Sequence, residues 1–182
     1  MRFHHTFLCI IGLALASCSA PDGRATPPLT AGKVDLARYT GRWHEIARLP
    51  APFQKDNESA IADYGMNADG TVSVHNIAVR PDGTQYGIMG YAKVLNPPEN
   101  TKLAVRFNTW FGPLIPVPDE GNYWILHVGE NYQEAIVGTP DRRFLWLLAR
   151  TPGISEKRYK TLVGKARDAG FDVTRLVITQ RP

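Results

Sequence analysis

Only a few residues of this chain have types and spacings that could support chemistry. His44 and His75 are isolated histidines in strand-like runs, and no two His, Cys or acidic residues recur at a metal-binding spacing. The sequence also contains no serine nucleophile elbow, phosphate-binding loop or paired-glycine dinucleotide motif. Glu45 alternates with Trp43 and is therefore expected on the same, inward side of its strand, either as a buried carboxylate bonded near the floor of the folded domain or as a catalytic group. We expect a binding protein rather than an enzyme, with no metal and no cofactor.

The N-terminal segment has the features of a secretory signal. Arg2 precedes an apolar run over residues 7–16, which is shorter than the roughly 20 residues needed to span a bilayer. The sequence Leu15-Ala16-Ser17-Cys18 follows and resembles a bacterial lipobox, in which cleavage leaves a cysteine that becomes acylated. We expect residues 1–17 to be removed as a signal peptide and Cys18 to carry lipid. An ordinary secretory cleavage site with a chance cysteine is the alternative.

The positions of the two cysteines also bear on disulfide formation and on the cellular location of the protein. Cys9 lies inside the segment to be removed, so the mature chain would have no thiol pair for a disulfide. Residues 18–33 are rich in Pro, Ala, Gly and Thr and predict a lipidated flexible tether before one domain over residues 34–182. Because Ser19 rather than Asp follows Cys18, we expect an outer-membrane location facing the periplasm.

The elements that must position these residues are short strands in a β-meander. Turn signals recur along the domain at Asp69-Gly70, Asp82-Gly83, Asn96-Pro97-Pro98, Gly129-Glu130-Asn131 and Pro140-Asp141. Strand-sized runs rich in β-branched or aromatic residues lie between them, over 59–64, 71–79, 84–95, 102–108, 123–128, 134–138 and 143–150. With a strand around Trp43 they make eight. The period then becomes helical at Tyr159, Leu162, Val163 and Ala166, between a capping Ser155 and a terminating Gly170, before a short strand over 173–179.

Three segments in order resemble the lipocalin family, and in particular its bacterial outer-membrane lipoprotein branch. They are Gly41-Arg42-Trp43, Gly129-Glu130-Asn131-Tyr132, and the run over 138–152 that contains Arg150. The middle segment departs from the usual Thr-Asp-Tyr of the family, because Asn131 can cap a turn but carries no charge. The resemblance implies an all-β fold, an eight-stranded antiparallel up-and-down barrel with a C-terminal helix packed outside.

The resemblance also assigns structural roles at the closed end of the barrel. Gly41 would leave room for the chain to turn into the barrel, and Trp43 would plug one end with an apolar ring. The Arg150 guanidinium is expected to lie across that ring and to bond nearby backbone carbonyls.

Strand alternation, taken with the family pattern, predicts an inward face made mostly of small or apolar side chains. This expected ligand-binding lining consists of Ala60, Ala62, Tyr64, Val74, Asn76, Ala78, Met89, Tyr91, Val105, Phe107, Tyr123, Ile125, Phe144, Trp146 and Leu148. The alanines leave volume that an acyl chain could fill, whereas a solid, fully packed barrel is the alternative.

A polar group for a ligand head is expected at the open end. The turn Asp141-Arg142-Arg143 supplies two candidate cations, Arg142 and Arg143, whose alternative role is turn chemistry and solubility. The Pro-rich segment 109–118, with 50–53, would form an exposed apolar collar around this end.

The function expected from these observations is that of a membrane-anchored carrier. Its ligand would be a fatty acid such as palmitate or a lysophospholipid, held in the barrel for transport or storage in the cell envelope. The alternative is an envelope interaction or structural protein that uses the apolar collar. The formal net charge of +4 does not imply nucleic-acid binding, and the sequence leaves both a monomer and a homodimer open.

Overall fold

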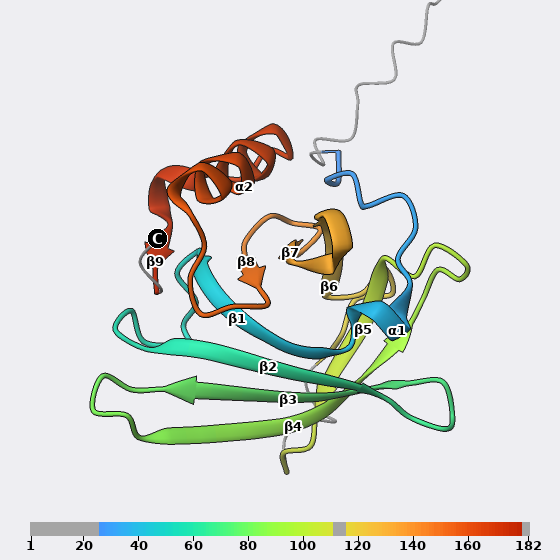
Figure 1. Ribbon diagram of the computed structural model, residues 1–182. Coiled ribbons are helices and arrows are strands. Elements are labelled where there is room, and N and C mark those ends of the chain that lie inside the picture. The colour runs from blue at the N-terminus through green and yellow to red at the C-terminus, as the bar shows by residue number, and fades with distance from the viewer. Residues whose placement is uncertain (1–25, 111–115, 180–182) are drawn as a thin grey trace, which may run out of the picture.

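The computed structural model describes residues 26–110 and 116–179, which form a closed antiparallel β-barrel with one helix outside (Figure 1). Its elements in chain order are α1 Leu36–Tyr39, β1 Gly41–Arg48, β2 Ser59–Met66, β3 Val72–Val79, β4 Gln85–Val94, β5 Lys102–Phe107, β6 Tyr123–Val128, η2 Glu130–Tyr132, β7 Glu134–Gly138, β8 Leu145–Ala149, α2 Glu156–Asp168, η3 Val173–Arg175 and β9 Val177–Ile178. The predicted fold class is confirmed, and the eight predicted barrel strands are present with small differences at their ends. The strand predicted over 173–179 is wrong in its first half, because Val173–Arg175 form the 3-10 helix η3 and only Val177–Ile178 pair as β9.

Strand β1 closes the barrel because it pairs with neighbours on both sides. Gly41 to His44 pair with Tyr64 to Ile61 of β2, and β1 also pairs with β8. The last residues of β1 pair in addition with β9, so the C-terminal strand extends the sheet outside the barrel.

Two apolar cores lie on opposite faces of β7 and β8, as strand alternation requires. Ala135 and Val137 of β7 belong to the core inside the barrel, with Trp43 and Leu148. Ile136 lies between them in sequence and belongs to the second core, which α2 covers. Helix α2 begins where predicted, because the side chain of Ser155 accepts a hydrogen bond from the Arg158 N–H at 3.4 Å.

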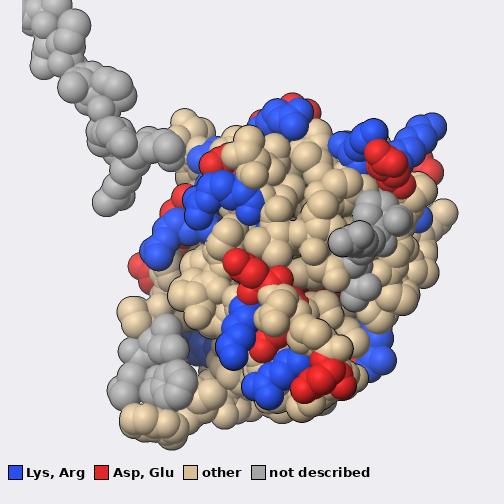
Figure 2. Space-filling view, turned by 90° about the vertical axis from the view of Figure 1, so that its left-hand side faces the viewer, with Lys and Arg blue, Asp and Glu red and all other residues tan. Residues whose placement is uncertain are grey.

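One end of the barrel, which we call the mouth, is formed by the connections after β1, β3 and β7. These are residues 49–58, 80–84 and 139–144, and the described part of the β5–β6 connection begins at the same end. Figure 2 looks onto this end and shows basic and acidic side chains next to one another among broad uncharged areas.

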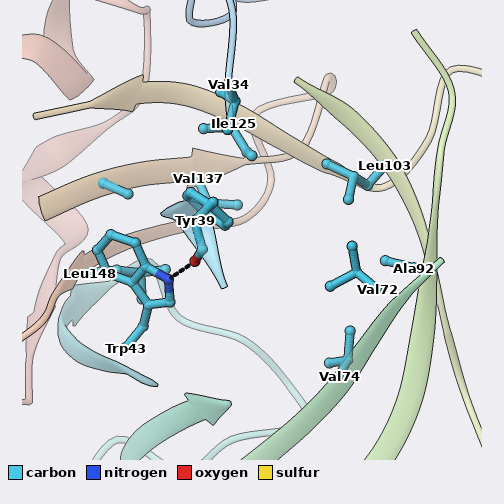
Figure 3. Packing of buried hydrophobic residues seen from close by; sticks show 11 residues of the cluster. Val34, Tyr39, Trp43, Val72, Val74, Ala92, Leu103, Ile125, Val137 and Leu148 are labelled. Carbon is cyan, nitrogen blue, oxygen red and sulfur yellow. Dashed lines mark hydrogen bonds between the residues drawn. The ribbon is translucent and has the colours of Figure 1, made fainter. Parts of the chain in front are cut away.

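The opposite end is closed by α1, a short helix that was not predicted. Asp35 caps α1 through hydrogen bonds from the Ala37 and Arg38 N–H groups, and the helix delivers the Tyr39 carbonyl to the Trp43 indole N–H at 2.8 Å (Figure 3). A helix this short carries little hydrophobic periodicity, so only its Asp cap could have indicated it.

The last part of the predicted tether lies against the barrel. Pro28 is buried, and the Ala31 N–H donates to the Ile125 carbonyl at 2.9 Å. The described end of the predicted tether is therefore held against the barrel by burial and by backbone hydrogen bonding. Residues 1–25, with the predicted signal peptide and Cys18, lie outside the described part.

Candidate ligand-binding site

Accessibility of the barrel interior changes along the barrel axis. Toward the closed end the inward-facing Trp43, Ile125 and Val137 are fully buried. Toward the mouth the inward-facing Ala60 and Ala78, which pair across β2 and β3, remain partly accessible. Ala62 and Asn76, which lie deeper on the same strands, are also partly accessible, so the structure favours an interior that is incompletely filled and opens toward the mouth.

Strand register places most of the predicted lining residues on the inner face. The pairs Ala62–Asn76, Tyr64–Val74 and Ala92–Val105 link β2, β3, β4 and β5 through one continuous face. The inward-facing residues that agree with the prediction are Ala60, Ala62, Tyr64, Val74, Asn76, Ala78, Val105, Phe107, Tyr123, Ile125, Trp146 and Leu148. Phe144 lies just before β8 and packs against Trp146 with ring centroids 6.1 Å apart.

The prediction for β4 is wrong by one residue. Met89 and Tyr91 are 51% and 41% exposed on the outer face, because their partners across β3 are the outward-facing His75 and Ser73. Gly90 instead pairs with the inward-facing Val74. A shift of one residue exchanges the two faces of a strand. In β4 the large Met89 and Tyr91 therefore lie on the outer face, and Gly90 between them lies on the inner face. Its inner face consequently carries the small Gly90 and Ala92 together with the larger Tyr86 and Ile88 toward the mouth.

Three tyrosine hydroxyl groups form a chain across the lower interior. The hydroxyl groups of Tyr39 and Tyr123 are 2.8 Å apart, and the Tyr123 hydroxyl donates to the Tyr64 hydroxyl at 3.1 Å. Burial raises the pKa of Tyr64 to about 12, and it raises that of Tyr123 as well. The hydroxyls are therefore neutral at physiological pH and give the otherwise apolar interior a hydrogen-bonding floor. Strand alternation predicted that Tyr64 and Tyr123 line the interior, but it did not predict the hydrogen bond between their hydroxyl groups.

A buried ion pair lies inside the barrel on the mouth side. Glu45 is 2% exposed and Arg48 fully buried, with Glu45 Oε1 3.5 Å from Arg48 Nε and 3.1 Å from the Gln54 amide nitrogen. Arg48 also donates to the carbonyls of Leu49 at 3.3 Å and Lys55 at 2.7 Å. The inward direction of Glu45 is confirmed, but its bonds lead to the mouth connection 49–58 and not to the floor.

Arg48 was missed because of a β-bulge. The register between β1 and β8 shifts between Glu45 and Ala47, so strict alternation fails there and Arg48 turns inward opposite Trp146. Burial raises the pKa of Glu45 to about 7, against the opposing effect of Arg48. The residue types of this strand do not indicate the bulge, so the inward direction of Arg48 could not be predicted from the sequence.

A second acidic group lies at the rim of the mouth. Glu58 is 1% exposed and accepts hydrogen bonds from the Tyr86 hydroxyl at 2.6 Å and the Lys55 N–H at 3.3 Å. The Tyr86 bond in particular lowers the pKa of Glu58. The Nε of Arg80 lies 3.6 Å from Glu58 Oε1, and its guanidinium lies over the Tyr86 ring at 4.9 Å. The sequence analysis did not identify this group.

The two predicted head-group cations have different surroundings. Arg142 Nε donates to the Ala169 carbonyl at 2.9 Å, so this side chain is bound to the end of α2. Arg143 is 72% exposed, and its guanidinium lies 5.5 Å from the Phe144 ring at the mouth. Of these two arginines, only Arg143 is exposed at the mouth, where a ligand head group would lie.

The described parts of the predicted apolar collar agree with the prediction in part, because Phe53 and Trp110 are exposed whereas Ala51 is buried. Phe53 is 66% exposed and packs against Phe144 with ring centroids 5.5 Å apart, which joins the first and the last mouth connections. Trp110 is 89% exposed, and residues 111–115 of the predicted 109–118 rim lie outside the described part.

The described ranges contain no group of three or more His, Cys, Asp or Glu residues that could hold a metal ion. Within the same ranges, no helix is both long enough and apolar enough to cross a membrane.

The closed end has the predicted arrangement. The Arg150 guanidinium carbon lies 3.7 Å from the centroid of the Trp43 ring. Its nitrogens donate to the carbonyls of Arg42 at 2.9 Å, Arg38 at 2.8 Å and Tyr132 at 3.1 Å. Gly41 adopts a φ of +92°, and an added Cβ would lie 3.4 Å from Arg150 Nη1, so the glycine is needed for its backbone conformation.

An antiparallel barrel sealed at one end, accessible at the other and flanked by a helix belongs to the class of small barrels that enclose a ligand. A family model described as a lipocalin-like domain matches residues 34–181. The chain therefore belongs to the lipocalin family, as its sequence motifs indicated. Lipocalins are typically non-enzymatic binding proteins with small hydrophobic ligands.

Several known proteins are similar to this chain. Temperature-induced lipocalin-1 of Arabidopsis thaliana is 39% identical over 146 residues, which cover 79% of this chain and 77% of that protein. Outer membrane lipoprotein Blc of Escherichia coli K12 is 34% identical over 172 residues, which cover 92% of this chain and 90% of that protein. Among solved structures, insecticyanin from the tobacco hornworm Manduca sexta matches with a TM-score of 0.61 at 18% identity, covering 85% of this chain and 84% of that one.

Proposed function

We propose that this lipocalin carries a single acyl lipid, a fatty acid or a lysophospholipid, in its barrel and that it does so attached to the outer membrane. The observation that carries the proposal is the interior that opens toward the mouth above a closed floor. Its inner wall combines Ala60, Ala62, Ala78 and Gly90 with larger apolar side chains. Burial of each methylene group of an acyl chain in such a space contributes roughly 0.8 kcal/mol before the costs of binding.

Attachment to the membrane is supported by the sequence and by a relative. The lipobox over residues 15–18 would place an acyl group on Cys18, and the similar protein of Escherichia coli is an outer membrane lipoprotein by name. A carrier held at the membrane surface could take up and release acyl lipids there.

The carrier proposal is tested by filling the interior from one wall. Ala62→Trp inserts a large ring on the inner face between Trp43 and Asn76, so palmitate binding should fall by about tenfold or more through steric exclusion. Met89→Trp adds a ring on the outer face and is the matched control, because its position does not face the interior. Binding is measured by titration of delipidated protein and by mass spectrometry of lipids that copurify.

Failure of the delipidated wild-type protein to bind any acyl ligand saturably would refute the carrier. If Ala62→Trp instead preserved cellular function, the alternative of an interaction protein that uses the Phe53 and Trp110 collar would be favoured.

A further inference from the structure

Asn76 places a primary amide on the inner wall of the barrel. It lies on β3 two residues after Val74, whose side chain points into the barrel in Figure 3. The Oδ1 atom of Asn76 is buried and accepts no hydrogen bond from the part of the chain that the structure describes. The cross-strand neighbours of Asn76 are Ala62 and Ile88, whose side chains have no polar atoms. A buried acceptor in such surroundings costs free energy unless another molecule supplies a donor.

The chain of tyrosine hydroxyl groups ends in a hydrogen atom that no described residue accepts. Each hydroxyl group has one hydrogen. Because Tyr123 donates its hydrogen to Tyr64, the bond between Tyr39 and Tyr123 uses the hydrogen of Tyr39. The hydrogen of Tyr64 is therefore left for another acceptor. The centroid of the Tyr64 ring lies 6.1 Å from those of both Tyr39 and Tyr123, and these ring contacts fix the position of the donor.

This acceptor and this donor are neighbours on the inner wall. Tyr64 pairs with Val74 across β2 and β3, so Asn76 is its diagonal neighbour on the same face. Diagonal neighbours on one face of a sheet are roughly 7–8 Å apart, a distance that an aromatic side chain can reach across. That spacing leaves room for one ligand group between the Asn76 amide and the Tyr64 hydroxyl.

The two protein groups discriminate among the polar groups that a ligand can carry. An alcohol hydroxyl donates one hydrogen and accepts through two lone pairs, so it can donate to Asn76 Oδ1 and accept from the Tyr64 hydroxyl. A carboxylate or a carbonyl group can only accept, and an ammonium group can only donate. An unsubstituted methylene chain would exclude water and leave both protein groups unpaired, which is costly in a site of low dielectric constant.

The depth of this polar pair determines where on an acyl chain the hydroxyl group must lie. Asn76 precedes Arg80 at the rim by four residues, which is roughly 13 Å along an extended strand. An eighteen-carbon acyl chain whose carboxylate lies at the mouth would therefore bring its distal half to Asn76 and Tyr64.

We propose that the interior of this barrel selects acyl ligands that carry a hydroxyl group in the distal half of the chain, bound between the Asn76 amide and the Tyr64 hydroxyl. The inference rests on the proposed carrier function and adds a ligand class that the head group does not determine. Asn76 and Tyr64 are its specificity-determining residues.

The test compares three eighteen-carbon probes on delipidated full-length protein: 12-hydroxystearate, 2-hydroxystearate and stearate. The wild type should bind 12-hydroxystearate about tenfold more tightly than either of the others, because only this probe has a hydroxyl group at the depth of Asn76. The probe 2-hydroxystearate controls for the hydroxyl group itself, which it keeps next to the carboxylate at the mouth. Calorimetric titration measures the affinities.

Two variants assign the preference to the proposed residues. Asn76→Leu replaces the amide with an apolar group of similar size, so the preference should disappear while stearate binds at least as tightly as to the wild type. Stearate binding by this variant also shows that the barrel is intact. Tyr64→Phe keeps the ring and should reduce the preference only about threefold, because the hydrogen of Tyr123 then becomes available to the ligand.

Tyr91→Phe removes a hydroxyl group from the outer face of β4 and is the matched control, with no change expected for any probe. Equal affinity of the wild type for 12-hydroxystearate and stearate would overturn the inference while leaving the carrier intact. A preference that persists undiminished in both Asn76→Leu and Tyr64→Phe would overturn it as well. Failure of the wild type to bind any of the three probes would refute the carrier itself.

Discussion

Arg150 connects three separate segments through one planar group. Its nitrogens reach carbonyls before β1, within β1 and before β7, and its flat face covers Trp43. Lysine could supply the charge but not the fork and the stacking face, so the role is specific to arginine.

Replacement of this residue should affect stability and leave binding unchanged. Arg150→Ala should lower the free energy of unfolding by about 2–4 kcal/mol, because it removes the stacking on Trp43 and leaves carbonyls unpaired at a partly buried site. Arg150→Lys should recover only a minor part of this loss, and Arg167→Ala on exposed α2 should change little. Chemical denaturation measures the effect. A variant with wild-type stability but without palmitate binding would move Arg150 into the ligand site.

Individual residues were predictable from the sequence where a motif identified them. Trp43 and Arg150 were placed correctly because the family pattern fixes both their types and their order. Arg48, Glu58 and Arg80 carry no motif. Glu58 and Arg80 approach each other because the connections after β1 and β3 converge at the mouth, and Arg48 turns inward because of the bulge in β1. Charged residues near turns are ordinarily solvated, so their type alone could not indicate a buried cluster.

Strand β1 shows how a local irregularity creates a functional feature. Its bulge turns Glu45 and Arg48 to the same side, and Arg48 then bonds the connection 49–58 from within the barrel. A regular strand would have directed Arg48 toward α2, into an apolar core that cannot compensate a charge.

The protonation of Glu45 should make the stability of this element depend on pH. Its pKa is raised from 4.5 to about 7, so the folded state binds the proton more tightly than the unfolded state. The stabilisation is complete below about pH 4.5 and is lost as the pH rises through about 7, by up to about 3 kcal/mol. The free energy of unfolding, measured by denaturant titration at several pH values, should therefore fall across this interval.

The matched variant isolates the carboxyl group from other titrating groups. Glu45→Gln cannot ionise, so the difference in stability between wild type and variant should change across pH 4.5–7, whatever the constant effect of leaving Arg48 with a neutral partner. A difference that stays constant over this interval would show that Glu45 does not titrate there.

At the scale of strands, sequence periodicity located the elements better than it oriented them. The boundaries of β6 and β7 agree with the prediction. Orientation failed in β4, because Met89 and Tyr91 are large enough to look like core residues whereas the inner positions are the small Gly90 and Ala92. Side-chain size is an unreliable guide to facing direction in this barrel, because its inner wall carries small residues such as Gly90 as well as large rings such as Phe107 and Trp146.

The whole molecule has a mouth and a sealed end, and its N-terminal segment is fixed to the barrel by Ala31. Attachment through Cys18 would limit how far this barrel can move from the membrane. The sequence could not indicate that residues next to the domain pack on it, because a segment rich in Pro, Gly and Thr has no apolar periodicity that would mark a packed face.

Lipidation can be tested on the full chain in a bacterial envelope. Cys18→Ala should abolish metabolic labelling with radioactive palmitate and shift the protein from the membrane fraction to a soluble or uncleaved form. Cys9→Ala is the control, because this residue lies in the segment expected to be removed, and its product should stay in the membrane fraction. An unchanged, labelled product from Cys18→Ala would contradict the anchor.

The closed end made by Trp43, Arg150 and α1 has a consequence for the order of events in the proposed carriage of a lipid. A barrel that is closed at one end has a single opening, so a bound ligand has to leave through the mouth by which it entered. A second ligand cannot enter from the closed end and displace the first. In the proposed carrier, an empty barrel must therefore exist, however briefly, between two successive ligands.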